Sequence, residues 1–460
     1  MGIRSTAGTA LTALRADLAG DVFAPGDAGY DAARAVFNAA VDRRPAVIAR
    51  CADAADVVRA VRFGRDLDLR IAVRGGGHAV AGTALGDGAL VVDLRRMRGV
   101  SVRPGAATAR VEGGATLRDL DRATRPYGLA SSGGCAPGIG VGGFVLGGGT
   151  GRLDRAFGLA VDDLLGVELV TADAERVRAG ADENPELFWA LHGGGGNFGI
   201  ATALTLRLHP LPEFSLALVV CRPDRGRDLV RAFREVIAAG PDAAGGAVLY
   251  TTGTPAPFLP KRLAGRLVCA ALLTYAGGPA GLRRLAAPLL VLPHEAEFAG
   301  AVPYADAPYL PAAPPGLRTH GSAECLAGLP DDLVDVFCAR ALTMPEPTGS
   351  RYVLVPRGGA GAAGPADRPV AHRHAPWLVH PFAMWAGPAG DERAAAWVKD
   401  ARADVRPWRT GAVCLTLIGD EGPERVRAGL GVGNTLRLAK VKRRHDPDNV
   451  FRFNHNIKPV

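Results

Sequence analysis

The sequence is poor in the features that build disulfide frameworks and membrane spans. Its seven cysteines form an odd set with no C-x-x-C pair, which argues against a disulfide framework or a zinc site and favours a reducing compartment. No stretch approaches 18 apolar residues, so no membrane span is predicted. Arg15 and Asp17 interrupt the N-terminal apolar residues before a signal-peptide core forms. A cytoplasmic location is therefore expected.

Lysine is also scarce, because only five of the 54 basic residues are lysine. The arginines scatter along the chain, whereas a nucleic-acid-binding protein gathers its basic residues into a stripe. The nearest approach to a stripe, Lys440–Arg444, is interpreted as a solvated helix end. No nucleic-acid partner is expected, and the net charge of +8 remains compatible with an anionic cofactor or substrate.

The overall composition is that of a globular protein. The 460 residues are 48% hydrophobic and 22% charged, and this length suggests two or three folding units. Short β-branched runs alternate with amphipathic stretches, which indicates an α+β fold with mixed sheets. Strands are predicted at 46–51, 70–77, 89–97, 108–116, 201–211, 215–221, 266–276 and 350–356, with a hairpin at 164–180 and helices at 52–67, 117–128, 226–239 and 331–340.

Three glycine-rich segments carry the first functional signal. Arg74-Gly75-Gly76-Gly77-His78 follows a predicted strand, and successive glycines let backbone N–H groups approach an anion such as a pyrophosphate. No Gly-Lys-Ser/Thr follows and no G-x-G-x-x-G opens a helix, so Walker and Rossmann loops are excluded. In the second segment, 138–151, eight of fourteen residues are glycine; the third is 192–199. Such runs indicate backbone passing close to a flat group or to another backbone.

In this order, the segments resemble the FAD-binding oxidoreductases of the vanillyl-alcohol-oxidase superfamily, in the berberine-bridge-enzyme branch. The resemblance covers 44–211 and the tail at 437–457. It implies a two-part PCMH-type FAD-binding domain with an inserted α/β substrate domain. The expected divisions are 1–211 for the FAD-binding domain, 212–430 for the substrate domain and 431–460 for a C-terminal segment that returns to the FAD-binding domain.

The resemblance also implies FAD, joined covalently to the protein through His78. A neutral imidazole is a good nucleophile near physiological pH, so addition to the flavin 8α-methyl carbon is chemically reasonable. The expected cofactor-binding positions are Arg74, Gly75, Gly76, Gly77, His78, Gly82, Cys135, Gly138, Gly142, Gly143, Phe144, Gly148, Val170 and Asn454.

Two motifs depart from the pattern of the family. Some relatives carry a second flavin link from a cysteine, but Cys135 stands one residue too far from the following glycines. A second link and an unreactive thiol beside the flavin both remain open for Cys135. Relatives also carry a Tyr-x-Asn motif whose tyrosine often acts as the base, and Cys414 and Thr416 occupy those positions here.

Another residue must then take the place of the missing base. Tyr250, Tyr352 and His372 lie on strand-like or adjacent segments and are the candidates, although each also fits a purely structural role. Glu346, between two prolines, is interpreted as a loop charge, and no His/Glu cluster has the spacing of a metal site.

The expected function is oxidation of a small organic substrate by hydride transfer to covalently bound flavin, with molecular oxygen as the electron acceptor. The high ratio of arginine to lysine is associated with GC-rich bacterial genomes and with natural-product biosynthesis. Three alternatives stay open. The first is a non-redox cyclisation or rearrangement in the same pocket, which the missing Tyr-x-Asn motif and the bulk of Phe144 favour; the second is a dehydrogenase, which would share the poor oxygen reactivity; the third is a binding protein that has kept the flavin fold.

Overall fold

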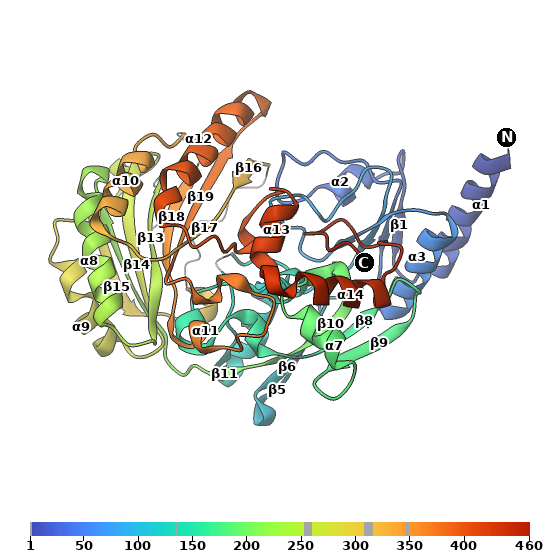
Figure 1. Ribbon diagram of the computed structural model, residues 1–460, viewed down its shortest axis with the longest axis horizontal. Coiled ribbons are helices and arrows are strands. Elements are labelled where there is room, and N and C mark those ends of the chain that lie inside the picture. Colours follow the sequence, from blue (N-terminus) through green and yellow to red (C-terminus); the bar gives the residue numbers. More distant parts are fainter. Residues whose placement is uncertain (1, 135, 253–259, 308–315, 346–348) are drawn as a thin grey trace.

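The computed structural model describes residues 2–134, 136–252, 260–307, 316–345 and 349–460, so Cys135 and Glu346 lie outside the described residues. The expected α+β class is confirmed, because separate mixed and antiparallel sheets are packed with helices (Figure 1). Among the described residues, no helix combines the length and the apolar character needed to cross a membrane.

The N-terminal region is built on two sheets. The first has the order β1-β2-β4-β3, in which β4 pairs in parallel with β2 and β3. Helix α3 connects β2 to β3, and the Asp53 side chain caps it by accepting hydrogen bonds from the N–H groups of Ala55 and Asp56. The second sheet is antiparallel, with the order β5-β6-β10-β8-β9. The bounds are α1 Gly2–Asp17, β1 Asp21–Phe23, α2 Tyr30–Arg34, β2 Val47–Arg50, α3 Ala54–Asp66, β3 Ile71–Arg74, β4 Leu90–Asp93, β5 Val100–Arg103, β6 Thr108–Glu112, β8 Leu164–Val170, β9 Arg176–Gly180 and β10 Ile200–Arg207.

Shorter elements connect these sheets and border the glycine runs. One of them, α5, forms inside the second glycine run, where the sequence predicts only a close backbone approach. The bounds are α4 Leu117–Thr124, β7 Leu129–Ala130, α5 Val141–Leu146, α6 Asp154–Phe157, α7 Pro185–Leu191 and β11 His209–Pro210.

The middle of the chain forms an eight-stranded sheet with the order β15-β12-β14-β13-β18-β19-β16, and β17 also pairs with β19. Helices α8, α9, α10 and α12 lie on one face (Figure 1). The other face is turned toward the glycine loops of the N-terminal region. The bounds are β12 Ser215–Cys221, α8 Gly226–Ala239, β13 Ala244–Thr252, β14 Leu267–Tyr275, α9 Pro279–Leu290, β15 Ala296–Ala301, β16 Arg318–Gly321, β17 Glu324–Leu326, α10 Asp331–Ala341, β18 Arg351–Pro356, α11 Gly359–Ala363, β19 Trp377–Trp385 and α12 Asp391–Asp404.

The C-terminal segment returns to the N-terminal region through α13 (Pro423–Leu430) and α14 (Thr435–His445). Leu415 and Leu430 already belong to the same apolar cluster as Val111 of the antiparallel sheet, although the sequence places the return at residue 431. The interpretation of Lys440–Arg444 as a solvated helix end is wrong for one of its four basic residues, because Lys442 is fully buried.

Candidate functional site

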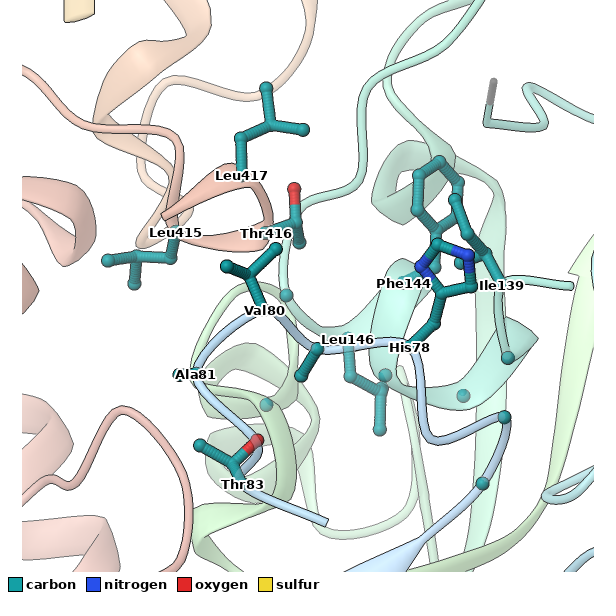
Figure 2. Close-up of a pocket in the computed structure, with 18 of the residues that line it drawn as sticks. His78, Val80, Ala81, Thr83, Ile139, Phe144, Leu146, Leu415, Thr416 and Leu417 are labelled. Carbon is teal, nitrogen blue, oxygen red and sulfur yellow. The ribbon is translucent and has the colours of Figure 1, made fainter. Parts of the chain in front are cut away.

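A cavity of about 670 Å³ separates the glycine loops from the helix-free face of the eight-stranded sheet. Figure 2 shows His78 and Phe144 on one side of it and Thr416 on another. All three glycine runs contribute to the wall, as does the C-terminal tail through Asn454. The fold therefore brings together segments that lie hundreds of residues apart in the sequence.

The first glycine run is held from behind by a buried arginine. Strand β3 ends at Arg74, whose guanidinium donates hydrogen bonds to the carbonyls of Ala33 (2.6 Å) and Ala35 (2.5 Å). Burial lowers the pKa of Arg74 to about 10. Gly77 takes a φ of +68°, and its carbonyl accepts a hydrogen bond from the Phe37 N–H. Arg74 does not border the cavity; it fixes the loop that does.

The first two glycine runs touch through their backbones. A Cβ placed on Gly76 would lie 2.5 Å from the Gly140 nitrogen, and one on Gly140 would lie 2.4 Å from the Gly76 nitrogen. No side chain fits at either position, which meets the expectation that these runs pack against another backbone. By contrast, a Cβ on Gly143, Gly195 or Gly196 would meet no described atom within 4 Å, although all three border the cavity. These glycines leave open space along the wall.

His78 is positioned by stacking and kept neutral by its surroundings. Its ring lies 3.9 Å from the Phe37 ring, centroid to centroid, at an interplanar angle of 14°. Burial lowers the pKa of His78 to about 4, so the imidazole is uncharged at neutral pH. A Cβ on Gly138 would lie 3.7 Å from the His78 Cδ2, which places the second glycine run directly beside the ring. A neutral imidazole on a cavity wall has the electron pair needed for a nucleophile.

The third glycine run and the C-terminal tail are bound to each other by several hydrogen bonds. The Asn197 side chain donates to the His455 carbonyl (3.1 Å) and accepts from the Ile457 N–H (2.9 Å). Lys442 donates to the Asn197 carbonyl at 2.7 Å. Asn454 donates to the Gly196 carbonyl at 3.3 Å, while its buried Oδ1 has no partner among the described residues. An acceptor left open on the wall fits a bound ligand that carries N–H groups.

The remaining expected cofactor contacts divide into two groups. Gly75, Gly76, Gly77, Gly138, Gly142, Gly143 and Phe144 border the cavity together with His78 and Asn454. Arg74, Gly82, Gly148 and Val170 do not, so a direct role for them is not supported. Val170 is buried in a core cluster, and a Cβ on Gly82 would meet Val41 at 2.5 Å. Cys135 lies outside the described residues.

The three candidate bases do not reach the cavity. Tyr250 and Tyr352 are fully buried on the helix-covered face of the sheet, where Tyr250 donates a hydrogen bond to the Pro223 carbonyl (3.1 Å). Burial raises the pKa of both phenols far above the ordinary value. His372 lies behind Gly148, and burial lowers its pKa well below the usual range. The prediction that one of them projects into the site is therefore wrong. A strand's side chains alternate between faces, and these tyrosines take the helix-covered face, while His372 lies in the short helical turn Ala371–His374 behind Gly148.

The positions of the missing Tyr-x-Asn motif are occupied by a thiol–hydroxyl pair. The Cys414 sulfur lies 3.4 Å from the Thr416 Oγ1. Cys414 is buried in the apolar core and burial raises its pKa, whereas Thr416 borders the cavity. Neither group replaces the tyrosine as a base.

One titratable residue on the sheet face was missed from the sequence. His380, on β19, borders the cavity, and its Nδ1 lies 2.7 Å from the Ser322 carbonyl oxygen. Because a carbonyl only accepts hydrogen bonds, Nδ1 carries the proton and Nε2 is left as an acceptor. Burial lowers the pKa of His380 to about 4. Alternation along 377–385 places His380 and the buried Val379 on opposite faces of the strand, but it does not tell which of the two faces borders the cavity.

Comparison with known proteins agrees with this geometry. Residues 45–180 match an FAD binding domain, and residues 423–458 match the family described as berberine and berberine-like. The chain is 31% identical to (R)-6-hydroxynicotine oxidase of Paenarthrobacter nicotinovorans over 455 residues, which cover 96% of this chain and 97% of that protein. Glucooligosaccharide oxidase of Sarocladium strictum is 40% identical over 192 residues, or 40% of this chain and 38% of that protein.

Solved structures show the same architecture. The crystal structure of 6-hydroxy-D-nicotine oxidase from Arthrobacter nicotinovorans superposes with a TM-score of 0.86 at 28% identity, covering 96% of this chain and 99% of that one. Physcomitrella patens BBE-like 1 gives a TM-score of 0.86 at 22% identity over 98% of this chain and 99% of that one, which shows the shared fold. The open glycine backbone and the Asn454 Oδ1, which has no partner among the described residues, fit the FAD of this group. The chain thus belongs to the berberine-bridge-enzyme-like family of FAD-linked oxidoreductases, and it is an FAD-dependent oxidoreductase.

Proposed function

We propose that the protein is an oxidase in which FAD lies in the cavity and is linked covalently to His78. The observation that carries this proposal is His78 itself: a neutral imidazole, stacked on Phe37, that borders the cavity beside Gly138. Gly75, Gly76 and Gly77 would hold the pyrophosphate, and Asn454 would accept a hydrogen bond from the ring system. When bound, FAD supplies the hydride acceptor.

The substrate would enter between the flavin site and the eight-stranded sheet. This cavity borders both parts of the fold, which is where small-molecule sites commonly form. We further propose that molecular oxygen takes up the electrons, since the relatives named above are oxidases. The arginine-rich composition supports, by association, a role in bacterial natural-product biosynthesis.

Denaturation in acid tests the covalent link. The purified protein is precipitated with acid, and the pellet is examined by visible spectroscopy and intact-mass analysis. Yellow colour on the polypeptide and a mass increased by one FAD are expected in the wild type and in His374→Ala, a control at an exposed histidine. Both signals should be lost in His78→Ala. A flavin that washes away from the wild type would refute the covalent link, and a colourless protein would refute the proposed function.

A dehydrogenase is the second candidate, because the bulky Phe144 borders the cavity beside Ile139. Mixing the chemically reduced protein with oxygen in a stopped-flow instrument separates the two. Rapid return of the flavin absorbance is expected for an oxidase. Slow return in the wild type, accelerated in Phe144→Ala, would favour the dehydrogenase.

A further inference from the structure

The wall opposite the flavin site is predominantly apolar. Strands β13, β14, β18 and β19 turn Ala247, Leu272, Val353, Val355, Leu378 and Phe382 toward the cavity. Ala247 pairs with Leu272 in the sheet register, so small and medium aliphatic groups lie side by side. A molecule resting on this wall gains by burying apolar surface.

His380 supplies a directed hydrogen-bond acceptor on this wall. It lies opposite Val353 in the register of β18 and β19. Its Nδ1–H donates a hydrogen bond to the Ser322 carbonyl, and no described group forms a hydrogen bond with Nε2. His380 is half-buried and borders the cavity, so a ligand can reach the open nitrogen. Because Nε2 carries no proton, it selects a ligand group that donates, such as a hydroxyl.

The permanently charged side chains among the described residues that line the cavity are all positive. The described residues that line it include Arg118, Arg152 and Arg351 but no aspartate or glutamate. A substrate with an ammonium group would be desolvated here without a carboxylate partner, which is costly. A carbohydrate would leave most of its hydroxyls facing aliphatic side chains, and each unpaired buried hydroxyl reduces affinity.

We propose that the substrate is a neutral alcohol on an apolar skeleton, whose hydroxyl donates a hydrogen bond to His380 Nε2. This inference rests on the proposed function. In the reaction, the hydroxyl proton would move to Nε2, and the C–H bond would break with its electron pair as a hydride, for which FAD would be the acceptor. The carbon–oxygen bond would become a carbonyl. Molecular oxygen would then take up the transferred hydrogen with its electron pair and the proton held on Nε2, which gives hydrogen peroxide and restores the neutral imidazole.

Four probes test the substrate class: 1-(2-naphthyl)ethanol, its methyl ether, 1-(2-naphthyl)ethylamine and cellobiose. Dissociation constants are measured anaerobically from the change each probe causes in the flavin spectrum, and flavin bleaching is recorded separately. The alcohol is expected to bind at least tenfold more tightly than the other three. Equal or tighter binding of the amine or cellobiose, or no binding of the alcohol, would overturn the substrate class. Absence of flavin absorbance would instead overturn the proposed function.

Variants at His380 test the hydrogen bond itself. His380→Phe keeps an apolar ring but removes the acceptor, so the alcohol and its ether should bind within twofold of each other. His380→Gln retains a carbonyl acceptor and should restore part of the preference for the alcohol over its ether. It also tests the hydrogen bond if the His380→Phe variant does not fold. His374→Phe, at an exposed position, is the matched control and should bind as the wild type does. An unchanged preference in both His380 variants would contradict the role of this residue.

Discussion

At the scale of single residues, the glycines of the two touching runs are the positions that tolerate least change. A Cβ on Gly76 would lie 2.5 Å from the Gly140 nitrogen and 2.9 Å from the Gly138 carbonyl oxygen. Both neighbours are backbone and cannot rotate away. We expect Gly76→Ala to force the loops apart, lowering the free energy of unfolding by about 1–3 kcal/mol and reducing flavin content.

The measurements for this prediction are urea denaturation and the ratio of flavin to protein absorbance. Gly105→Ala is the matched control, because a Cβ there meets no described atom within 4 Å and the backbone has no positive φ. Its stability and flavin content should equal those of the wild type. Normal flavin content in Gly76→Ala would show that the contact between the loops does not shape the site.

Some residues of the candidate site could be located from the sequence, and others could not. The glycine runs, with His78 at the end of the first, could be singled out from the sequence because segments so rich in glycine do not build a hydrophobic core. Tyr250 and Tyr352 were misplaced because both faces of the eight-stranded sheet are covered, so hydrophobic alternation does not tell the cavity face from the helix face. For the same reason His380, one position along from a buried valine, gave no distinct signal.

At the scale of elements, α14 and the tail after it depend on one buried ion pair. The side chains of Lys442 and Asp446 are fully buried and 2.6 Å apart, and Lys442 also donates to the Phe451 carbonyl at 2.9 Å. Lys442→Met would leave the carboxylate without its charged partner. We expect the free energy of unfolding to fall by about 3–5 kcal/mol.

The control lies on the same helix. Lys440 is exposed, so Lys440→Met changes the same chemical group without removing a buried contact and should alter stability by less than about 0.5 kcal/mol. Both variants are compared by urea denaturation followed by circular dichroism. Equal stability of the two would mean that Asp446 is satisfied by the N–H groups of Val450 and Phe451 alone, which donate to it at 2.7 and 2.9 Å.

Elements with strong periodicity were predicted closely, and irregular ones were not. Strand β12 and helix α8 have the predicted bounds, because a long apolar run and an amphipathic repeat leave little ambiguity. Strand β19 was missed: it contains Pro381 and His380, which weaken a strand pattern. This loss matters for the proposed function, since β19 carries His380 on the wall proposed to bind the substrate.

At the scale of the whole molecule, the cavity exists because the chain leaves the N-terminal region and then returns to it. The eight-stranded sheet supplies an apolar wall, while the glycine runs and the tail supply open backbone, His78 and Asn454. The loops proposed to hold the cofactor are thus separate from the surface proposed to select the substrate. This separation explains why motifs in the sequence indicated the cofactor but were silent about the substrate.

Buried neutral histidines in both parts of the molecule should make its stability fall in mild acid. Burial lowers the pKa of His192 and His380 to about 4, from an ordinary value of 6.5, and lowers that of His372 well below the ordinary value. Between pH 6.5 and 4 the unfolded chain therefore binds protons that the folded protein does not. Stability contributed by these residues is present above pH 6.5 and is lost as the pH falls, by about 3 kcal/mol for His192 alone.

Urea denaturation of the flavin-loaded protein at pH 7, 6, 5 and 4 measures this dependence. The free energy of unfolding should decrease steadily over the series, and the decrease should become smaller in His192→Gln, because that side chain does not titrate. His374→Ala, at an exposed position, should keep the slope of the wild type. A stability that is constant or rises from pH 7 to pH 4 would contradict the lowered pKa values of these histidines, because the folded protein would then bind at least as many protons as the unfolded chain over this range.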